Sequence, residues 1–414
     1  MSSTIAPQVN SAVLRAAAVP ENVGFSGERL LRITRAFHSE VNTGGLPGAV
    51  VLVARKGQIV LSEAYGFRDR EAGAPMRFDD IFRIASMTKP ITIVAALMLA
   101  EEGKLLLPEA VGKYLPEFAD LKVGVEGPNG QLSLIDLKQP MTVHDLMRHT
   151  SGLTYGLFGK SVIKTRYNQA GVFSLLNTNE QMAKKLAELP LCYQPGTTFD
   201  YGMSTDVLGR IIEVISGQTL GEFLNRRLFV PLGMKDTGFA VPHGSGRIAQ
   251  PQADPVTGVR VPMADPLVPM PWESGGAGLS STACDYLHFS QMLLNDGELD
   301  GTRYLSPFSV RLMSSDHLPS EVAFDPATLP LFGGEAPMPI MGQGFGLGVA
   351  VRTHDGVNPL PGSVGNYYWG GALGTYFWID PKEQLIAIMM TQAPADRLRY
   401  RYLIQQLVYQ ALVI

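Results

Sequence analysis

The chain has 414 residues, 45% of them hydrophobic and 17% charged, and its formal net charge is −4. This composition is typical of a globular protein, and the lack of any Lys/Arg run argues against nucleic acid and anionic membranes as partners. The N-terminus lacks the basic start and unbroken apolar core of a signal peptide, and no apolar run reaches the roughly 18 residues that a membrane span requires. Cys192 and Cys284 give neither a disulfide framework nor a metal-ligand spacing, so we expect a cytoplasmic protein.

The N-terminal part of the chain predicts a helix, then a pair of strands, then a second helix. Residues 26–45 begin with a serine cap, carry apolar residues at helical spacing and end in two glycines. Residues 48–67 predict two strands joined by a tight turn at Lys56 and Gly57. The second helix, residues 87–102, is apolar nearly all round, which indicates that it is buried.

The pattern changes in the middle of the chain and changes back near its end. From about Leu106 to Glu273 it favours turns and amphipathic helices, with no convincing run of strands. Residues 243–278 are rich in Pro and Gly, which predicts a segment that wraps the surface or rims a cleft. Strand patterns then return before a final helix over residues 397–412. These strands cover residues 345–351, 367–371, 374–380 and 385–392.

Early strands, a helical middle and late strands predict an α+β fold. One antiparallel sheet is built from both chain ends and flanked by helices, and a mostly helical lobe is inserted into it. We assign residues 1–105 and 274–414 to the domain with the sheet, and residues 106–273 to the helical domain with its cleft-rim loops. A cleft between the two parts is the expected site.

A serine and a lysine three residues apart, Ser86 and Lys89, open the apolar second helix. A hydroxyl is a poor nucleophile unless a neighbouring base takes its proton, and burial disfavours the ammonium form of lysine, which makes a buried lysine a plausible base. The helix N-terminus also offers backbone N–H groups to a developing oxyanion. The pair therefore predicts nucleophilic catalysis by Ser86.

About one Ser-x-x-Lys should arise by chance in a chain of this composition. A second pair does occur at Ser161 and Lys164, in a polar stretch with no apolar helix behind it, and we interpret it as coincidental. Other catalytic patterns are missing. The nearest approach to Gly-x-Ser-x-Gly has Asp206 in place of its last glycine, and His144 and His149 lie five residues apart where zinc-binding helices use four.

Several segments in order resemble one superfamily. FRIASMTKP, residues 82–90, resembles the serine-lysine motif of the class C β-lactamases and penicillin-binding proteins, and four further segments look like its other landmarks. These are LMRHTSGLTYG (146–156), PGTTFDYGMSTDVLG (195–209), SGGAGLSSTACDYLHF (274–289) and WGGALGTYFWIDP (369–381). The resemblance covers nearly the whole chain and implies the β-lactamase-like fold.

The resemblance also implies roles for individual residues. Tyr201 corresponds to the tyrosine that completes the catalytic set with Ser86 and Lys89 as a proton carrier. The N–H groups of Ser86 and Ala372 would form the oxyanion hole. Whether Lys89 or Tyr201 is the general base stays open, because the two would titrate as a coupled pair, and either predicts a neutral-to-alkaline optimum. The implied chemistry requires no metal and no organic cofactor.

Two departures from the penicillin-recognising pattern bear on the substrate. No Tyr-x-Asn occurs, and Met203 stands where the asparagine would be; Trp369, Gly370 and Gly371 replace the Lys-Thr-Gly motif. Met203 and Trp369 offer apolar surface instead of an amide partner and a cation, which favours neutral esters over anionic β-lactams. These substitutions resemble the family VIII carboxylesterases. The glycines let a strand backbone approach the substrate closely.

Further side chains are assigned to substrate binding, and several rivals remain. Tyr155, Phe158 and Trp272 are candidate pocket walls, and Asp206 could reach the cleft from the first turn of its helix. We expect a serine carboxylesterase for short- to medium-chain esters, with a small-molecule ester as its partner. The chain is a monomer or a homodimer, and the sequence does not distinguish them. The rivals are a β-lactamase or D-amino-acid peptidase, an acyltransferase, and a binding protein that kept the fold without the chemistry.

Overall fold

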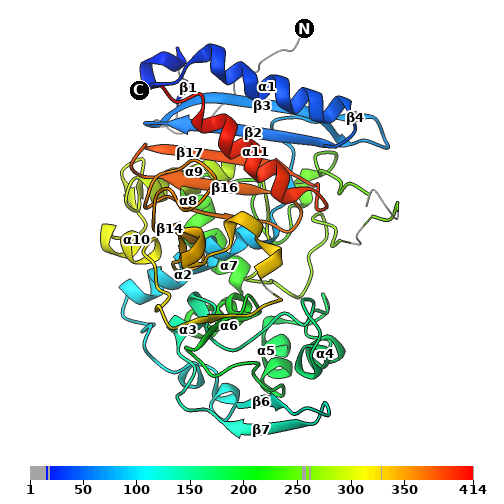
Figure 1. Ribbon diagram of the computed structural model, residues 1–414, viewed down its shortest axis with the longest axis vertical. Helices are drawn as coiled ribbons and strands as arrows, with labels where there is room; N and C mark the ends of the chain where they lie inside the picture. Colours follow the sequence, from blue (N-terminus) through cyan, green and yellow to red (C-terminus); the bar gives the residue numbers. More distant parts are fainter. Residues whose placement is uncertain (1–14, 17–18, 254–257, 261–262, 328, 414) are drawn as a thin grey trace.

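The computed structural model describes residues 15–16, 19–253, 258–260, 263–327 and 329–413. Its largest sheet has nine strands in the described residues, in the order β1-β3-β2-β17-β16-β15-β14-β13, with β4 beside β3 (Figure 1). Neighbouring strands are antiparallel except for β1 and β3. Their bounds are β1 Arg15–Ala16, β2 Gly48–Arg55, β3 Gln58–Asp69, β4 Ala74–Pro75, β13 Gln343–Phe345, β14 Ala350–Arg352, β15 Tyr367–Gly370, β16 Tyr376–Asp380 and β17 Leu385–Thr391.

The centre of the sheet joins the two ends of the chain. Strand β17 lies between β16 and β2, and its residues Leu385–Thr391 pair in register with Arg55–Ala49 of β2. Every residue of β2 and β17 is buried, because helices cover both faces of the sheet. Helices α1 and α11 cover one face, as Figure 1 shows, and α9 packs on β2, β16 and β17. The predicted sheet from both chain ends is therefore confirmed.

Eleven α-helices occur in the described residues, and Ser or Thr caps open several of them, including α1, α5 and α9. Helix α2 is buried from Thr88 to Leu99 and packs against α6, as its apolar sequence predicts. The bounds are α1 Gly27–Asn42, α2 Thr88–Glu101, α3 Val143–Met147, α4 Val162–Gln169, α5 Asn179–Ala187, α6 Ser204–Ser216, α7 Leu220–Leu224, α8 Val230–Leu232, α9 Ala283–Leu294, α10 Pro307–Met313 and α11 Arg397–Tyr409.

Short strand pairs hold the rest of the chain together. Strand β5 (Phe82–Arg83) pairs with β9 (Ser280–Ser281), and β8 (Thr198–Phe199) pairs in parallel with β12 (Ala323–Phe324). Strands β10 (Glu298–Leu299) and β11 (Thr302–Arg303) form a small hairpin. The first two pairs matter for the site, because each precedes a segment that carries a candidate catalytic side chain.

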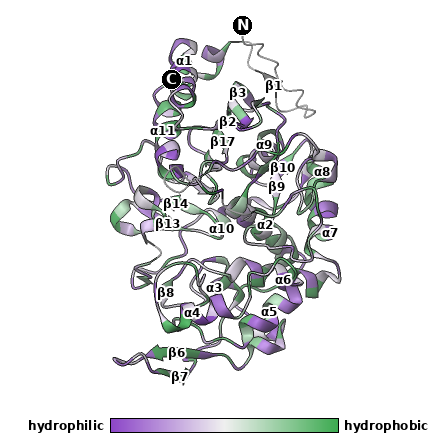
Figure 2. Ribbon diagram, turned by 90° about the vertical axis from the view of Figure 1, so that its right-hand side faces the viewer, coloured by the Kyte–Doolittle hydropathy of each residue, from purple (hydrophilic) through white to green (hydrophobic). Residues whose placement is uncertain are grey.

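The structure corrects two sequence expectations. A hairpin of β6 (Lys122–Glu126) and β7 (Leu132–Asp136) lies in the helical part, where no strands were expected, at the end of the molecule opposite α1 and α11 (Figure 2). Strand β7 is mostly exposed, so no buried apolar face marks it in the sequence. The single strand predicted over residues 345–351 is divided between β13 and β14, because Gly348 takes a φ of 72° and reverses the chain.

The segment 243–278 follows the surface near β5. Arg83 donates hydrogen bonds to the carbonyls of Ala249 and Ala264, and Ile81 pairs with Ile248. Residues 254–257 and 261–262 of this segment lie outside the described residues. The domain boundaries at residues 105/106 and 273/274 stay a prediction. None of the helices that the structure describes is long and apolar enough to cross a membrane.

Candidate active site

Ser86 lies on a tight turn between a strand and a buried helix. Strand β5 is fixed by its pairing with β9 and by the hydrogen bond from Ile84 N to Leu279 O at 3.0 Å. The chain then forms a 3-10 turn, Ala85–Met87, in which Ala85 has a φ of 44°. A non-glycine residue in this region is strained, and such strain is concentrated at functional sites. Ser86 itself is partly exposed at the start of α2.

The ammonium group of Lys89 is buried directly beside this serine. Lys89 is 0% exposed, and its Nζ lies 3.3 Å from Ser86 Oγ, 3.2 Å from the Tyr155 hydroxyl and 2.8 Å from the Gly276 carbonyl oxygen. These three acceptors match the three N–H groups of an ammonium. The side chain is therefore held in one position against Ser86, as the Ser-x-x-Lys pattern predicts.

Tyr201 faces the same lysine from the helical part of the chain. It follows β8 and precedes α6, and Lys89 Nζ lies 4.5 Å from the centre of its ring. The Tyr201 hydroxyl accepts a hydrogen bond from Trp369 Nε1 at 3.2 Å. The structure thus brings Ser86, Lys89 and Tyr201 together, with Trp369 holding the tyrosine hydroxyl.

Tyr201 is packed from behind by a histidine that the sequence analysis did not place in the site. The His149 ring lies 4.8 Å from the Tyr201 ring, and Gly202 N donates to its Nδ1 at 3.4 Å. Burial, with the nearby charge of Lys89, lowers the pKa of His149 well below its ordinary value. A neutral His149 fits its role as a packing residue.

Tyr155 contacts Lys89 directly, whereas the sequence analysis expected it only as a pocket wall. Its hydroxyl is one of the three acceptors around Lys89 Nζ, and its ring lies 5.6 Å from that of Tyr201. Burial, together with the charge of Asp206 nearby, raises the pKa of Tyr155 well above its ordinary value. Tyr155 therefore keeps its proton at neutral pH and acts as a polar support for Lys89.

Asp206 lies beneath the site rather than on the cleft, which corrects the expected role in substrate binding. It is 1% exposed, and its Oδ1 accepts hydrogen bonds from Ser274 Oγ and from Gly276 N, the latter at 3.1 Å. Gly276 in turn offers its carbonyl to Lys89. Burial raises the pKa of Asp206, and the positive charge of Lys89 opposes this shift.

Met203 and Trp369 also differ from expectation. Met203 is 0% exposed at the start of α6, so it presents no surface to a substrate. Trp369 is 3% exposed and packs on Phe332 and Phe345, with its indole N–H directed at Tyr201. The sequence shows the residue type at both positions. It does not show that these side chains are buried, because burial depends on tertiary packing.

The turn after β15 lies against the turn that carries Ser86. A Cβ on Gly371 would come within 2.4 Å of the Ile84 carbonyl oxygen, and Thr375 Oγ1 donates to that same oxygen at 3.2 Å. Only glycine permits this approach. The next residue, Ala372, is exposed, and within the described part of the chain its N–H makes no hydrogen bond. It is thus free to act as an oxyanion donor.

Aromatic side chains form one wall beside this centre. Phe158 lies 6.1 Å and Phe173 5.9 Å from the Tyr155 ring, and Trp272 lies 6.4 Å from Phe173. Phe158 and Trp272 were expected here, while Phe173 was missed. It lies in the loop between α4 and α5, and no motif singles it out. Each of the three is partly exposed.

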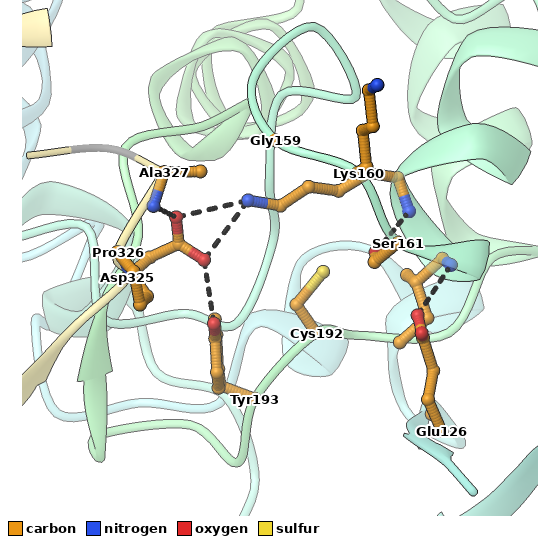
Figure 3. A pocket seen from close by; sticks show the side chains of 12 residues that line it. Glu126, Gly159, Lys160, Ser161, Cys192, Tyr193, Asp325, Pro326 and Ala327 are labelled. Atoms are coloured by element: carbon orange, nitrogen blue, oxygen red, sulfur yellow. Dashed lines mark hydrogen bonds and ion pairs between the residues drawn. The ribbon is translucent and has the colours of Figure 1, made fainter. Parts of the chain in front are cut away.

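The second Ser-x-x-Lys pair serves a different purpose. Ser161 caps α4 through the Lys164 N–H, and Lys164 Nζ forms a buried ion pair with Asp325 at 3.1 Å. Figure 3 shows Tyr193 and Asp325 facing each other across this region, joined by a hydrogen bond of 2.7 Å. The residues line a pocket of about 370 Å³ that does not include Ser86. The Ser-x-x-Lys spacing of this pair is therefore coincidental, as expected, and the structure adds that both side chains have structural roles.

The fold and the site together define a serine hydrolase of the β-lactamase-like class. Within the described residues, no group of three or more His, Cys, Asp or Glu side chains could hold a metal ion. Ser86 lies in the 3-10 turn before α2, Lys89 in α2 and Tyr201 in the segment before α6, and the turn with Ala372 joins β15 and β16.

Comparisons with known proteins give the family. The Beta-lactamase family model matches residues 33–409, and the chain belongs to this family. Protein Rv1367c of Mycobacterium tuberculosis is 37% identical over 363 residues, which cover 86% of this chain and 88% of the relative. Esterase EstB of Burkholderia gladioli is 32% identical over 387 residues, covering 87% and 89%. The resemblance to the β-lactamase and penicillin-binding-protein superfamily is therefore confirmed, and an esterase is among the relatives.

A solved structure agrees with this assignment. EstCE1, described as a hydrolase with promiscuous acyltransferase activity, matches with a TM-score of 0.78 and 26% sequence identity. The match covers 92% of this chain and 99% of EstCE1. The fold is thus the β-lactamase-like fold along nearly the whole chain.

Proposed function

We propose that this protein hydrolyses neutral carboxylic esters of short to medium chain length through an acyl-enzyme on Ser86. The observation that carries the proposal is the buried Lys89 side chain, whose Nζ lies 3.3 Å from Ser86 Oγ and 4.5 Å from the centre of the Tyr201 ring. A buried lysine beside a serine at a strained turn is costly for stability alone and suits nucleophile activation.

The steps follow from this geometry. Ser86 Oγ attacks the ester carbonyl carbon while its proton passes to the base, which is either the unprotonated amine of Lys89 or the phenolate of Tyr201, and the oxyanion is bound by the N–H groups of Ser86 and Ala372. The tetrahedral intermediate collapses, the C–O bond to the alcohol breaks, and Tyr201 or Lys89 returns the proton to the departing alkoxide. Water then attacks the acyl-enzyme with the same base and releases the acid and free Ser86.

The residues around Ser86 favour an uncharged substrate. Trp369 takes the place of the lysine that would hold a substrate carboxylate, and its N–H is engaged by Tyr201. Phe158, Phe173 and Trp272 offer apolar and aromatic surface instead. The 32% identity to an esterase, EstB, supports the same choice.

The test is a rate assay of p-nitrophenyl butyrate beside a chromogenic cephalosporin, with wild type and Ser86→Ala. We expect rapid ester turnover that falls to the uncatalysed background in Ser86→Ala, because the acyl-enzyme cannot form, and little cephalosporin cleavage. Ser161→Ala is the matched control, since its hydroxyl only caps α4. Cephalosporin turnover comparable to ester turnover would contradict the neutral-ester assignment, and activity that survives in Ser86→Ala would contradict the nucleophile.

Acyl transfer to an alcohol is a second candidate. Its support is the structural match to EstCE1, whose description includes promiscuous acyltransferase activity. The same acyl-enzyme serves both reactions, and the outcome depends on whether water or an alcohol attacks it. Product analysis of the p-nitrophenyl butyrate reaction with added n-butanol separates them: butyl butyrate in excess of butyrate at moderate alcohol concentration identifies a transferase, and butyrate alone a hydrolase.

A further inference from the structure

One peptide group carries both an oxyanion donor and a buried charge contact. The N–H of Ala372 and the carbonyl of Gly371 belong to the same peptide, and none of the peptide bonds that the structure describes is cis. In a trans peptide the N–H and the C=O point in opposite directions. The groups that bind the Gly371 oxygen therefore fix where the Ala372 N–H points.

The Gly371 oxygen is bound by a guanidinium group and by a backbone N–H group. Arg401 of α11 donates from Nη2 to Gly371 O at 2.6 Å and to Thr375 O at 3.3 Å, and Gly374 N donates to Gly371 O at 3.0 Å. Both lone pairs of the carbonyl are thus used, one of them by a cation. Hydrogen bonds from charged donors are shorter and stronger than neutral ones.

Arg401 is built into this position. It is 5% exposed, its Nη1 lies 3.4 Å from the buried Glu335 Oε2, and its Cζ lies 5.4 Å from the Tyr376 ring centre. A Cβ on Gly370 would lie 2.4 Å from Arg401 Cζ, so the guanidinium rests against the bare backbone of β15. The absence of a side chain at Gly370 is what admits the cation.

We propose that Arg401 is a positioning residue for the oxyanion hole, acting through the carbonyl of Gly371. Its guanidinium fixes the plane of the Gly371–Ala372 peptide and polarises it, so that the opposite N–H is a stronger and better-aimed donor to the oxyanion. This inference rests on the proposed function, because the donor matters only if Ser86 forms a tetrahedral adduct. In this way the C-terminal helix contributes to a site whose other residues come from distant parts of the sequence.

The test compares Arg401→Met, which keeps most of the volume and removes the charge, with Arg399→Met on the same helix. Arg399 is exposed and pairs with Glu40, so it is a matched control for loss of one arginine from α11. Activity on p-nitrophenyl butyrate is expressed per active site titrated with a serine-directed phosphonate. We expect kcat to fall about 10- to 100-fold in Arg401→Met, less than the 10²–10³ typical for complete loss of one donor, with KM within about twofold.

A second readout separates oxyanion binding from a merely structural role. Butylboronic acid forms a tetrahedral adduct with the serine, and its Ki should rise by the same factor as kcat/KM falls. The kcat and the boronate Ki of Arg401→Lys should lie between those of wild type and those of Arg401→Met. Gly370→Ala should displace the guanidinium and lower kcat similarly, with little further loss when combined with Arg401→Met. These two variants carry the test if Arg401→Met does not fold.

The outcomes distinguish this inference from the function on which it rests. Wild-type kcat per titrated site in Arg401→Met, or an unchanged boronate Ki, overturns the role of Arg401 while leaving the esterase intact. Additive losses in the Gly370→Ala, Arg401→Met double variant also overturn it. Absence of Ser86-dependent ester turnover in wild type overturns the proposed function instead.

Discussion

The indole N–H of Trp369 lies 3.2 Å from the Tyr201 hydroxyl oxygen, in the position where penicillin-recognising relatives carry a lysine. The sequence shows that a cation is missing there, but it does not show which way the replacing side chain points. That direction depends on Phe332 and Phe345, which lie 5.2 Å from the Trp369 ring. Trp369 therefore supports Tyr201 and is not available as pocket surface.

Trp369→Phe should keep this packing and remove only the donor. A net hydrogen-bond contribution of about 0.5–1.5 kcal/mol corresponds to a fall in kcat of roughly 2- to 12-fold, with KM nearly unchanged. Tyr367→Phe is the control, since it removes a buried hydroxyl from the same strand away from Tyr201. Steady-state kinetics on p-nitrophenyl butyrate checks this, and a Trp369→Phe enzyme as fast as Tyr367→Phe would contradict the role of the indole N–H.

Residue types and order were enough to predict which side chains meet at the candidate site. Ser86, Lys89 and Tyr201 stand in ordered motifs, and in the structure Lys89 contacts both Ser86 and Tyr201. The sequence could not indicate that Asp206 is buried or that Arg401 reaches Gly371. Burial and long-range contacts are properties of the packed chain, and one sequence carries no local signal for them.

Helix α3 is tied to the segment after α10 by a pair of histidines. His144 Nε2 lies 3.0 Å from His317 Nδ1, and His317 Nε2 lies 2.7 Å from Leu312 O. Burial, with Arg148 and His317 nearby, lowers the pKa of His144 to about 4 against the partial opposition of Asp145, and burial also lowers that of His317. At least one ring must be neutral for this bond to form.

The pair should make stability fall on acidification. Because the folded-state pKa of His144 lies below the unfolded value, the unfolded chain binds more protons between about pH 6.5 and 4, so stability is lost as pH falls through that window. Urea unfolding at pH 7.5 and pH 5 should show a smaller pH difference in His144→Gln than in wild type. His354→Gln, an exposed histidine, should behave as wild type, and equal pH differences in all three would contradict the prediction.

Local sequence signals predicted helices and strands well where an element has a buried apolar face and a clear cap or turn at its end. Helix α1 follows its Ser26 cap, and β2 and β3 meet at Lys56 and Gly57, both with positive φ. The hairpin β6–β7 was missed, because β7 is largely exposed and lacks the apolar alternation of a strand that covers a core. Strand prediction therefore failed where the strand is exposed and has no periodic apolar pattern.

At the scale of the whole molecule, the largest sheet pairs strands from opposite ends of the chain. The pairing of Ala49–Arg55 with Leu385–Thr391 holds these ends together whatever lies between them in the sequence. The tip of the β6–β7 hairpin, residues 128–131, is exposed and lies at the far end of the molecule (Figure 1). Exposed loop tips tolerate cleavage when few contacts depend on them.

A specific protease site inserted between Asn129 and Gly130 should therefore allow cutting without loss of function. We expect the nicked protein to stay associated on gel filtration, to unfold in one transition and to keep ester turnover within about twofold of the uncut form. The same site inserted after Ala372 should abolish turnover, because it breaks the oxyanion turn. Separation of the fragments after the first cut would contradict the account of the sheet.

The turn that carries Ser86 and the turn that carries Ala372 touch at Ile84 and Gly371, yet they stand near opposite ends of the sequence. During synthesis the serine emerges from the ribosome long before the turn that completes its site. Under the proposed function, a chain still being translated would have Ser86 without the Ala372 N–H group, and it would lack one of the two oxyanion donors. The proposal therefore implies that ester turnover begins only after the C-terminal strands have been synthesised and have joined the sheet.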